Sequence, residues 1–138
     1  MDKLTPCAGI IVFNTDQTIL VSTDRGNFSF PKGKRNKTET NIQAAWRELE
    51  EETGLTNDHV RLFNDIYFDE KTDKGYLSVR YFVGVLIKPI DKFKFDKNEL
   101  ANVAWYKIDD AIRIEKFKKS RKDILTDAYL FVKTMNTV

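Results

Sequence analysis

Apolar and polar positions along the chain follow two periods, one typical of strands and one typical of helices. Apolar, β-branched-rich runs predict strands over 7–13 and 18–22, with a turn at 14–17 between them, and further strands over 60–68, 76–88 and 103–108. Residues 71–75 have turn composition, and 91–98 is a charged loop. Residues 24–37 are rich in glycine and charge, which predicts a long loop around a short extended piece at 28–30.

Two stretches carry helical signals. Thr40 and Gln43 fit a capping box, in which each side chain satisfies an amide at the helix start, and Gly54 suits the left-handed position after a last turn. A stripe of apolar residues at steps of three and four predicts a second helix over 121–135, and 109–110 could begin a short helical turn. Strands interleaved with two substantial helices predict an α/β layered domain.

The composition favours a globular protein and argues against disordered, disulfide-rich and membrane-spanning classes. With 138 residues, 41% of them hydrophobic and 12% aromatic, the chain suits one globular domain, 1–138, rather than a disordered segment. The lone Cys7 excludes a disulfide framework or a four-thiolate zinc site, and it fits a reducing, cytoplasmic setting. The longest uncharged apolar stretches, 7–13 and 81–87, are far too short for a membrane span, and no secretory signal is visible.

The unusual feature is a crowd of acids on the first helix: five of the eight glutamates lie between positions 39 and 52. At about 100° per residue with Glu48 at 0°, Glu51 falls near 300° and Glu52 near 40°, so three carboxylates share one face. Glu50, at about 200°, points away from this face. The same wheel places an apolar stripe beside the acids, formed by Ile42, Trp46 and Leu49.

This arrangement opposes folding. Like charges three or four residues apart cost about 0.2–0.5 kcal/mol each, and acids in a last turn face the negative end of the helix dipole. A hard divalent cation would reverse both penalties, because Mg²⁺ prefers oxygen ligands, and it would also neutralise phosphate charge. The alternative for three such glutamates alone is a solvated acidic surface.

The surrounding pattern favours the metal. Gly33, five residues, Glu39, seven residues and then Arg-Glu-Leu-x-Glu-Glu-x-Gly-Leu over 47–55 fill every fixed position of the Nudix box. The chain therefore resembles the Nudix (MutT-like) hydrolase superfamily, over essentially its whole length. The resemblance implies an α/β/α sandwich with a central mixed sheet. It also implies Mg²⁺- or Mn²⁺-dependent hydrolysis of a nucleoside diphosphate linked to another group.

By the same resemblance, Glu48, Glu51 and Glu52 are the expected metal ligands, together with the backbone carbonyl near Gly33. The general base is either Glu48 or a loop acid before the late strand, for which Glu99 is the candidate. Arg47, at about 260° on the wheel and beside Glu51, is the remaining catalytic candidate, because an ion pair there could orient the acid cluster. Two further residues are expected to be structural: Glu39 braces the loop before the helix, although it could be only a surface acid, and Gly54 ends the helix.

Substrate contacts are expected from Lys32 and Lys34, whose ammonium groups suit phosphate oxygens, and from Arg25, although the loop charges could simply be solvated. Tyr81, on a strand that resembles the base-binding strand of diadenosine tetraphosphate hydrolases, could stack on a purine or belong to the core. Phe28 is a second stacking candidate. His59 is read as a surface residue.

The approach sequence Phe-Pro-Lys-Gly-Lys over 30–34 resembles Nudix enzymes that act on diadenosine polyphosphates, RNA caps or diphosphoinositol polyphosphates. Dinucleoside polyphosphates are the first choice of substrate. Six positive charges against one acid in 113–122 argue for capped RNA or a long polyphosphate, unless they form a solvated surface. A nucleotide sensor without catalysis is the alternative from another class. The sequence leaves the oligomeric state open.

Overall fold

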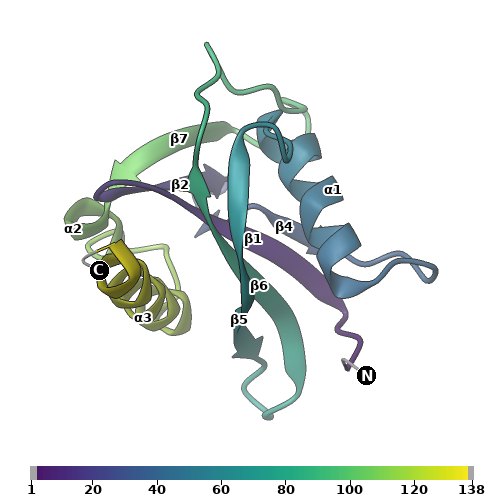
Figure 1. Cartoon of the computed structure of the whole chain (residues 1–138). Helices are drawn as coiled ribbons and strands as arrows, with labels where there is room; N and C mark the ends of the chain where they lie inside the picture. Colours follow the sequence, from purple (N-terminus) through teal and green to yellow (C-terminus); the bar gives the residue numbers. More distant parts are fainter. Residues whose placement is uncertain (1–2, 137–138) are drawn as a thin grey trace.

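The computed structural model describes residues 3–136 and places a twisted sheet between two helices (Figure 1). Its elements in chain order are β1 (Cys7–Asn14), β2 (Gln17–Ser22), β3 (Phe28–Ser29), β4 (Lys32–Lys34), α1 (Asn41–Thr53), β5 (Val60–Lys71), β6 (Leu77–Leu86), β7 (Asn102–Lys107), α2 (Ile108–Ala111) and α3 (Lys119–Asn136). The sandwich of helix, mixed sheet and helix that the sequence predicted is confirmed.

The sheet is built around β1. Its strand order is β3-β2-β1-β6-β5, while β4 pairs with β1 and β7 pairs with β2. Strands β1 and β6 run parallel, in a register that aligns Cys7 with Val79 and Phe13 with Val85, and every other pair is antiparallel. Because β4 joins the same half of β1 that carries Cys7–Gly9, the loop before α1 is fixed to the centre of the sheet.

Alternating side chains of β1 supply two separate cores. Ile11 and Phe13 face α3 and pack with its Leu125 and Ala128, whereas Ile10 faces α1. The core on the α1 side also contains Ala8, Val12, Ala44, Ala45 and Leu49. The strand is buried on both faces, which is why it reads as a continuous apolar run rather than an alternating one.

Local chemistry fixes both ends of α1. The Thr40 hydroxyl accepts a hydrogen bond from the Gln43 amide at 3.2 Å, and the Gln43 side chain accepts one from the Thr40 amide at 2.9 Å. Gly54 follows the helix with φ of 84°, a conformation that favours glycine, and its amide donates to the Glu50 carbonyl. The predicted capping box and glycine stop are confirmed.

Several boundaries differ from the predictions. The segment 32–34, predicted as loop, forms β4, and β5 continues past residue 68 to Lys71. Helix α3 begins two residues before 121. Ile42, predicted on the apolar stripe of α1, is 42% exposed. Within residues 3–136, no helix combines the length and the apolar character needed to cross a membrane.

Candidate active site on the first helix

The helical wheel predicted that the acidic face of α1 lies beside its buried side. In the structure, two of these acids are themselves partly buried. The residues that bury α1 against the sheet are Asn41, Ala44, Ala45, Leu49 and Thr53, and their mean direction falls between Glu48 and Leu49. Glu52, near 40°, therefore lies within the buried face and Glu48, at 0°, lies at its edge; both are partly buried, while Glu51 is exposed. The buried side differs from the predicted stripe because it includes the small Ala44 and Ala45, while Trp46 is only partly buried against the same core and Ile42 is exposed.

Strand β4 lies directly against these two acids. The amide of Lys32 donates a hydrogen bond to Glu52 Oε1 at 3.0 Å. The carboxylate of Glu48 occupies the space in which a Cβ on Gly33 would stand. Glycine is required at position 33 for this close approach and not for an unusual backbone angle, because its φ is not in the left-handed region. The main chain of 32–33 and the two carboxylates thus form one contact surface.

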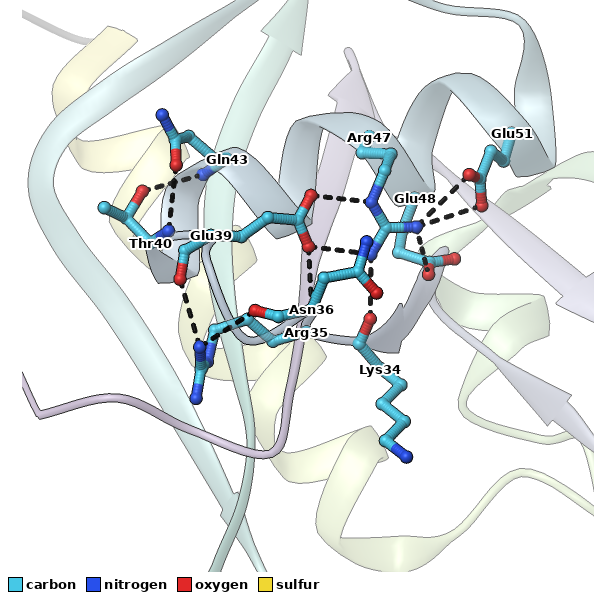
Figure 2. A network of polar contacts seen from close by, with 9 residues as sticks. All are labelled: Lys34, Arg35, Asn36, Glu39, Thr40, Gln43, Arg47, Glu48 and Glu51. Carbon is cyan, nitrogen blue, oxygen red and sulfur yellow. Dashed lines mark hydrogen bonds and ion pairs between the residues drawn. The ribbon is translucent and has the colours of Figure 1, made fainter.

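Arg47 joins the acids to the preceding loop (Figure 2). Its Nε donates to Glu39 Oε2 at 2.7 Å, and its Nη2 donates to the Lys34 carbonyl at 2.8 Å. Its Nη1 donates to Glu48 Oε1 at 3.0 Å and to the Glu51 carboxylate at 3.2 Å. One guanidinium therefore connects α1, β4 and the loop between them, and these contacts include the ion pair with Glu51 that the sequence predicted.

Glu39 braces the loop before α1, as the resemblance implied. Besides Arg47, its carboxylate accepts the amide of Asn36 at 2.8 Å. Hydrogen bonds from Arg47 and Asn36 lower the pKa of Glu39 to about 2, so it remains charged across the physiological range. Arg35, which the sequence reasoning missed, fastens the same loop to the N-terminal segment through the Thr5 carbonyl at 2.9 Å and also donates to the Glu39 carbonyl.

The two partly buried acids hold their protons more tightly than free carboxyls do. Burial raises the pKa of Glu52 to about 8, with a further rise from the negative charges of Glu48 and Glu99 and an opposing effect of the Lys32 amide. Burial also raises the pKa of Glu48, together with the charge of Glu51, while Arg47 opposes this. Glu99 acts on both groups, which places the loop acid near the cluster, and its own side chain is exposed.

The chemistry of these donors fits a hard divalent cation. Glu48, Glu51 and Glu52 offer carboxylate oxygens, and the main chain of β4 offers carbonyls. In residues 3–136, however, no three acidic, His or Cys side chains already converge to hold a metal. Nη1 of Arg47 lies between Glu48 Oε1 and the Glu51 carboxylate. A cation held by both carboxylates would compete with this nitrogen for their oxygens.

Tyr81, predicted as a stacking residue, is completely buried, so the structure rejects that role and supports the alternative of a core tyrosine. Its ring packs edge-on against Phe30, and its hydroxyl donates to Glu70 Oε1 at 2.7 Å. Arg121 donates to the same oxygen at 2.9 Å and to the Phe28 carbonyl at 3.2 Å. No sequence pattern predicts this network, because its members lie far apart in the chain.

The remaining substrate-binding candidates are Arg25, which precedes β3, Phe28 in β3, and Lys32 and Lys34 in β4. Phe28 is half-buried and packs edge-on against Tyr106, with ring centroids 5.8 Å apart. Arg25 is exposed, and its carbonyl accepts a hydrogen bond from Lys116 Nζ at 2.8 Å. Lys32 is half-buried and Lys34 is exposed. Their ammonium groups have no ion pair within the described part of the chain.

Comparison with known proteins gives a family match. A model of the NUDIX domain matches residues 3–128. Over 113 residues the chain is 34% identical to an Acanthamoeba polyphaga mimivirus protein provisionally named for mRNA decapping, covering 76% of this chain and 31% of that protein. It is 26% identical over 121 residues to an mRNA-decapping protein of African swine fever virus, covering 77% and 48%. The chain thus spans less than half the length of these relatives.

The fold is also found in solved structures. The binary complex of a C. elegans Ap4A hydrolase superposes with a TM-score of 0.81 at 22% identity, covering 93% of this chain and 98% of that one. A NUDIX hydrolase from Nitrosomonas europaea superposes with a TM-score of 0.70 at 23% identity, covering 95% and 91%. At these identities the likeness concerns the fold.

Proposed function

The chain belongs to the NUDIX domain family, and from that premise we propose that it is a metal-dependent pyrophosphohydrolase of nucleoside polyphosphates. The observation that carries this proposal is the contact of Glu48 and Glu52 with the main chain of β4, next to Glu51 and under the control of Arg47. This arrangement gathers hard oxygen donors where the loop from Phe28 to Lys34 can present positive side chains to phosphates. A nucleotide sensor would not need all three acids.

Nudix hydrolases generally use a divalent metal, and we assign Mg²⁺ or Mn²⁺ to Glu48, Glu51, Glu52 and the carbonyl near Gly33. When bound, such an ion neutralises charge on the non-bridging phosphate oxygens and lowers the pKa of water. The residues of the chain supply the rest. Arg47 keeps the carboxylates in place through its permanent contacts with Glu39 and the Lys34 carbonyl.

One carboxylate must also act as the general base that accepts the proton of the attacking water. Glu99 is suited to this role, because it is exposed and its charge reaches both Glu48 and Glu52. Glu48 is the alternative, because burial raises its pKa towards the range in which a carboxylate works as a base. Replacing each by Gln and measuring kcat at saturating Mg²⁺ separates the two: the base is the residue whose loss removes the acidic limb from the pH profile of kcat.

For the substrate, we propose a dinucleoside polyphosphate, with Lys32, Lys34 and Arg25 contacting phosphates and Phe28 contacting a base. The second candidate is the 5′ end of RNA, and the observation that favours it is the basic segment 113–122, which lies against Arg25 and Phe28. A capped end contains the same kind of linkage, a polyphosphate between two nucleosides. The single thiol, Cys7, supports a reducing, cytoplasmic setting.

Release of phosphate products from diadenosine tetraphosphate, measured with Mg²⁺, Mn²⁺ or EDTA, tests the proposal. We expect activity only with metal, and a loss of at least a hundredfold in kcat for Glu52→Gln. Glu50→Gln is the matched control, since Glu50 is an exposed acid on the same helix and points away from the cluster. Tight nucleotide binding by the wild-type protein without turnover on diadenosine tetraphosphate, capped RNA or diphosphoinositol pentakisphosphate would contradict the proposal in favour of a sensor.

A further inference from the structure

Positive charge is concentrated in one short part of the chain. Residues 113–122 contain six basic residues and one acid, which gives this segment a formal charge of +5. The whole chain carries +2, so all the other residues together carry −3. The protein therefore has one strongly basic segment, although the rest of its chain is slightly acidic. This concentration of charge does not follow from the overall composition.

The segment is fixed next to the proposed active site. The amide of Phe28 donates to the Lys116 carbonyl at 3.0 Å, and Phe28 and Phe117 form a bridge of the parallel type. Lys116 Nζ also holds the Arg25 carbonyl. The basic segment thus runs along the outer side of the loop that leads, through Phe28, to Lys32 and Lys34.

Beyond Lys116 the segment borders a recess of about 560 Å³. Three exposed lysines line it: Lys71 from the end of β5, Lys118 from just before α3, and Lys119, the first residue of α3, whose Nζ also pairs with Asp123 at 3.1 Å. Three hydroxyl-bearing residues and two acids complete the lining: Thr72, Ser78, Ser120, Glu70 and Asp73. Glu70 is already bound to Arg121 and Tyr81, so Asp73 is the lining acid without such a buried partner.

We propose that this surface, defined as Arg25, Lys116, Lys118, Lys119 and Lys71, holds the sugar-phosphate backbone of single-stranded RNA whose 5′ end lies in the active site. The proposal rests on the proposed function and names RNA as the larger substrate. Charge complementarity supports it, because ammonium groups gathered on one surface attract the phosphates of a nucleic acid. Phe28, the half-buried aromatic residue bound to Lys116, is suited to stacking with a base.

An anionic membrane is the other partner that a basic surface could attract, but the apolar residues of the segment do not suit it. Membrane-surface helices expose apolar side chains next to their basic ones. Here Phe117 is buried in the core on the α3 side, and Ile114 packs against the same core. With its apolar side chains turned inward, the segment offers charge without an insertion surface.

The test measures binding apart from hydrolysis. A fluorescent 20-nucleotide RNA with a 5′-hydroxyl has no bond for the enzyme to cleave, and its affinity is followed by anisotropy between 50 and 300 mM salt. For Lys71→Ala/Lys118→Ala/Lys119→Ala, loss of three phosphate contacts predicts about a hundredfold weaker binding at 0.1 M salt and a salt slope smaller by about 2. The control, Lys88→Ala/Lys92→Ala, changes exposed lysines beyond the opposite end of β6 and should bind as the wild type does.

Two activity measurements distinguish failure of this inference from failure of the proposed function. The triple variant should lose at least tenfold in kcat/KM on capped RNA while hydrolysing diadenosine tetraphosphate as the wild type does. If the wild type hydrolyses these substrates but RNA affinity is the same in the triple variant, or falls equally in the control, the RNA surface is refuted and the function stands. If RNA binds as predicted without any hydrolysis, the function fails and the surface stands. Binding to phosphatidylserine vesicles without binding to RNA would overturn the proposal in favour of a membrane.

Discussion

Replacing Gly33 by Ala separates the geometry of the site from the stability of the fold. A Cβ at this position would overlap the Glu48 carboxylate, the far end of a flexible side chain, and not a neighbouring part of the backbone. The strand can therefore accept alanine if Glu48 turns away. Turning away removes the hydrogen bond from Arg47 to Glu48 Oε1 and moves one of the proposed metal ligands.

The two effects differ in size. A side chain moved off its preferred rotamer costs about 0.5–1.5 kcal/mol, and alanine recovers about 0.4–1 kcal/mol by restricting the unfolded chain. The free energy of unfolding should therefore change by less than about 1 kcal/mol, which shifts Tm by only about 3–4 °C. Activity should fall much further, because displacement of a reacting group by about 1 Å can cost about a hundredfold in rate.

Kinetics with Mg²⁺ and thermal unfolding, measured on the same preparations, test this reasoning. Gly9→Ala provides the contrast, because its Cβ would meet the Pro31 carbonyl and the Lys32 main chain, so stability and activity should fall together. Wild-type kcat in Gly33→Ala would refute the assigned position of Glu48. A loss of more than about 3 kcal/mol in unfolding free energy would show that the backbone, not the carboxylate, fills the space.

Three further outcomes follow from the network of charges. Arg47→Lys should lower kcat by about ten- to a hundredfold, because one ammonium cannot replace the planar fork that reaches Glu39 and Glu48 together; steady-state kinetics and the Mg²⁺ dependence measure this. Burial raises the pKa of Glu70, but hydrogen bonds from Arg121 and Tyr81 more than offset this, and the net pKa is lowered from 4.5. The charged Glu70 carboxylate, bound to Arg121, therefore stabilises the fold fully above about pH 4.5. This contribution is lost as the pH falls through the pKa that Glu70 has in the folded protein. In urea unfolding, Glu70→Leu should cost about 3–5 kcal/mol at pH 7 and show a smaller loss of stability on acidification. Tyr81→Phe keeps the ring and removes only the hydroxyl that donates to Glu70, so urea unfolding should show a loss of about 1 kcal/mol in stability while KM for the nucleotide stays unchanged.

Much of the fold was predictable because it depends on signals within short stretches. The capping residues Thr40 and Gln43 and the terminal Gly54 fix α1 through contacts no more than four residues apart. The strand β4 was missed for the opposite reason. Lys32–Lys34 has no strand composition, and it is extended because Cys7–Gly9 provides a partner more than twenty residues away.

The candidate site shows the same division. The box glutamates and Arg47 are near neighbours on one helix, so their spacing predicts that they meet. The spacing of these residues along the chain does not show which of them are buried. The predicted stripe contained Ile42, Trp46 and Leu49, yet the buried side of α1 also includes the small Ala44 and Ala45, and Glu48 and Glu52 lie against β4. The role of Tyr81 failed likewise, since its partners Glu70 and Arg121 come from β5 and α3.

The contacts of Arg47 divide into a permanent and an exchangeable set, and this division explains how one cluster can be stable both with and without a cation. Nε and Nη2 bind Glu39 and the Lys34 carbonyl, neither of which is a proposed ligand through these atoms. Nη1 alone binds Glu48 and Glu51. Without metal, the guanidinium offsets the repulsion between these acids, which the helix would otherwise bear near the negative end of its dipole. A cation held by the two carboxylates would compete only with Nη1, and Nε and Nη2 would keep both anchors to the loop. Glu39, with its pKa lowered to about 2, therefore serves as the counter-ion that leaves Arg47 satisfied in either state.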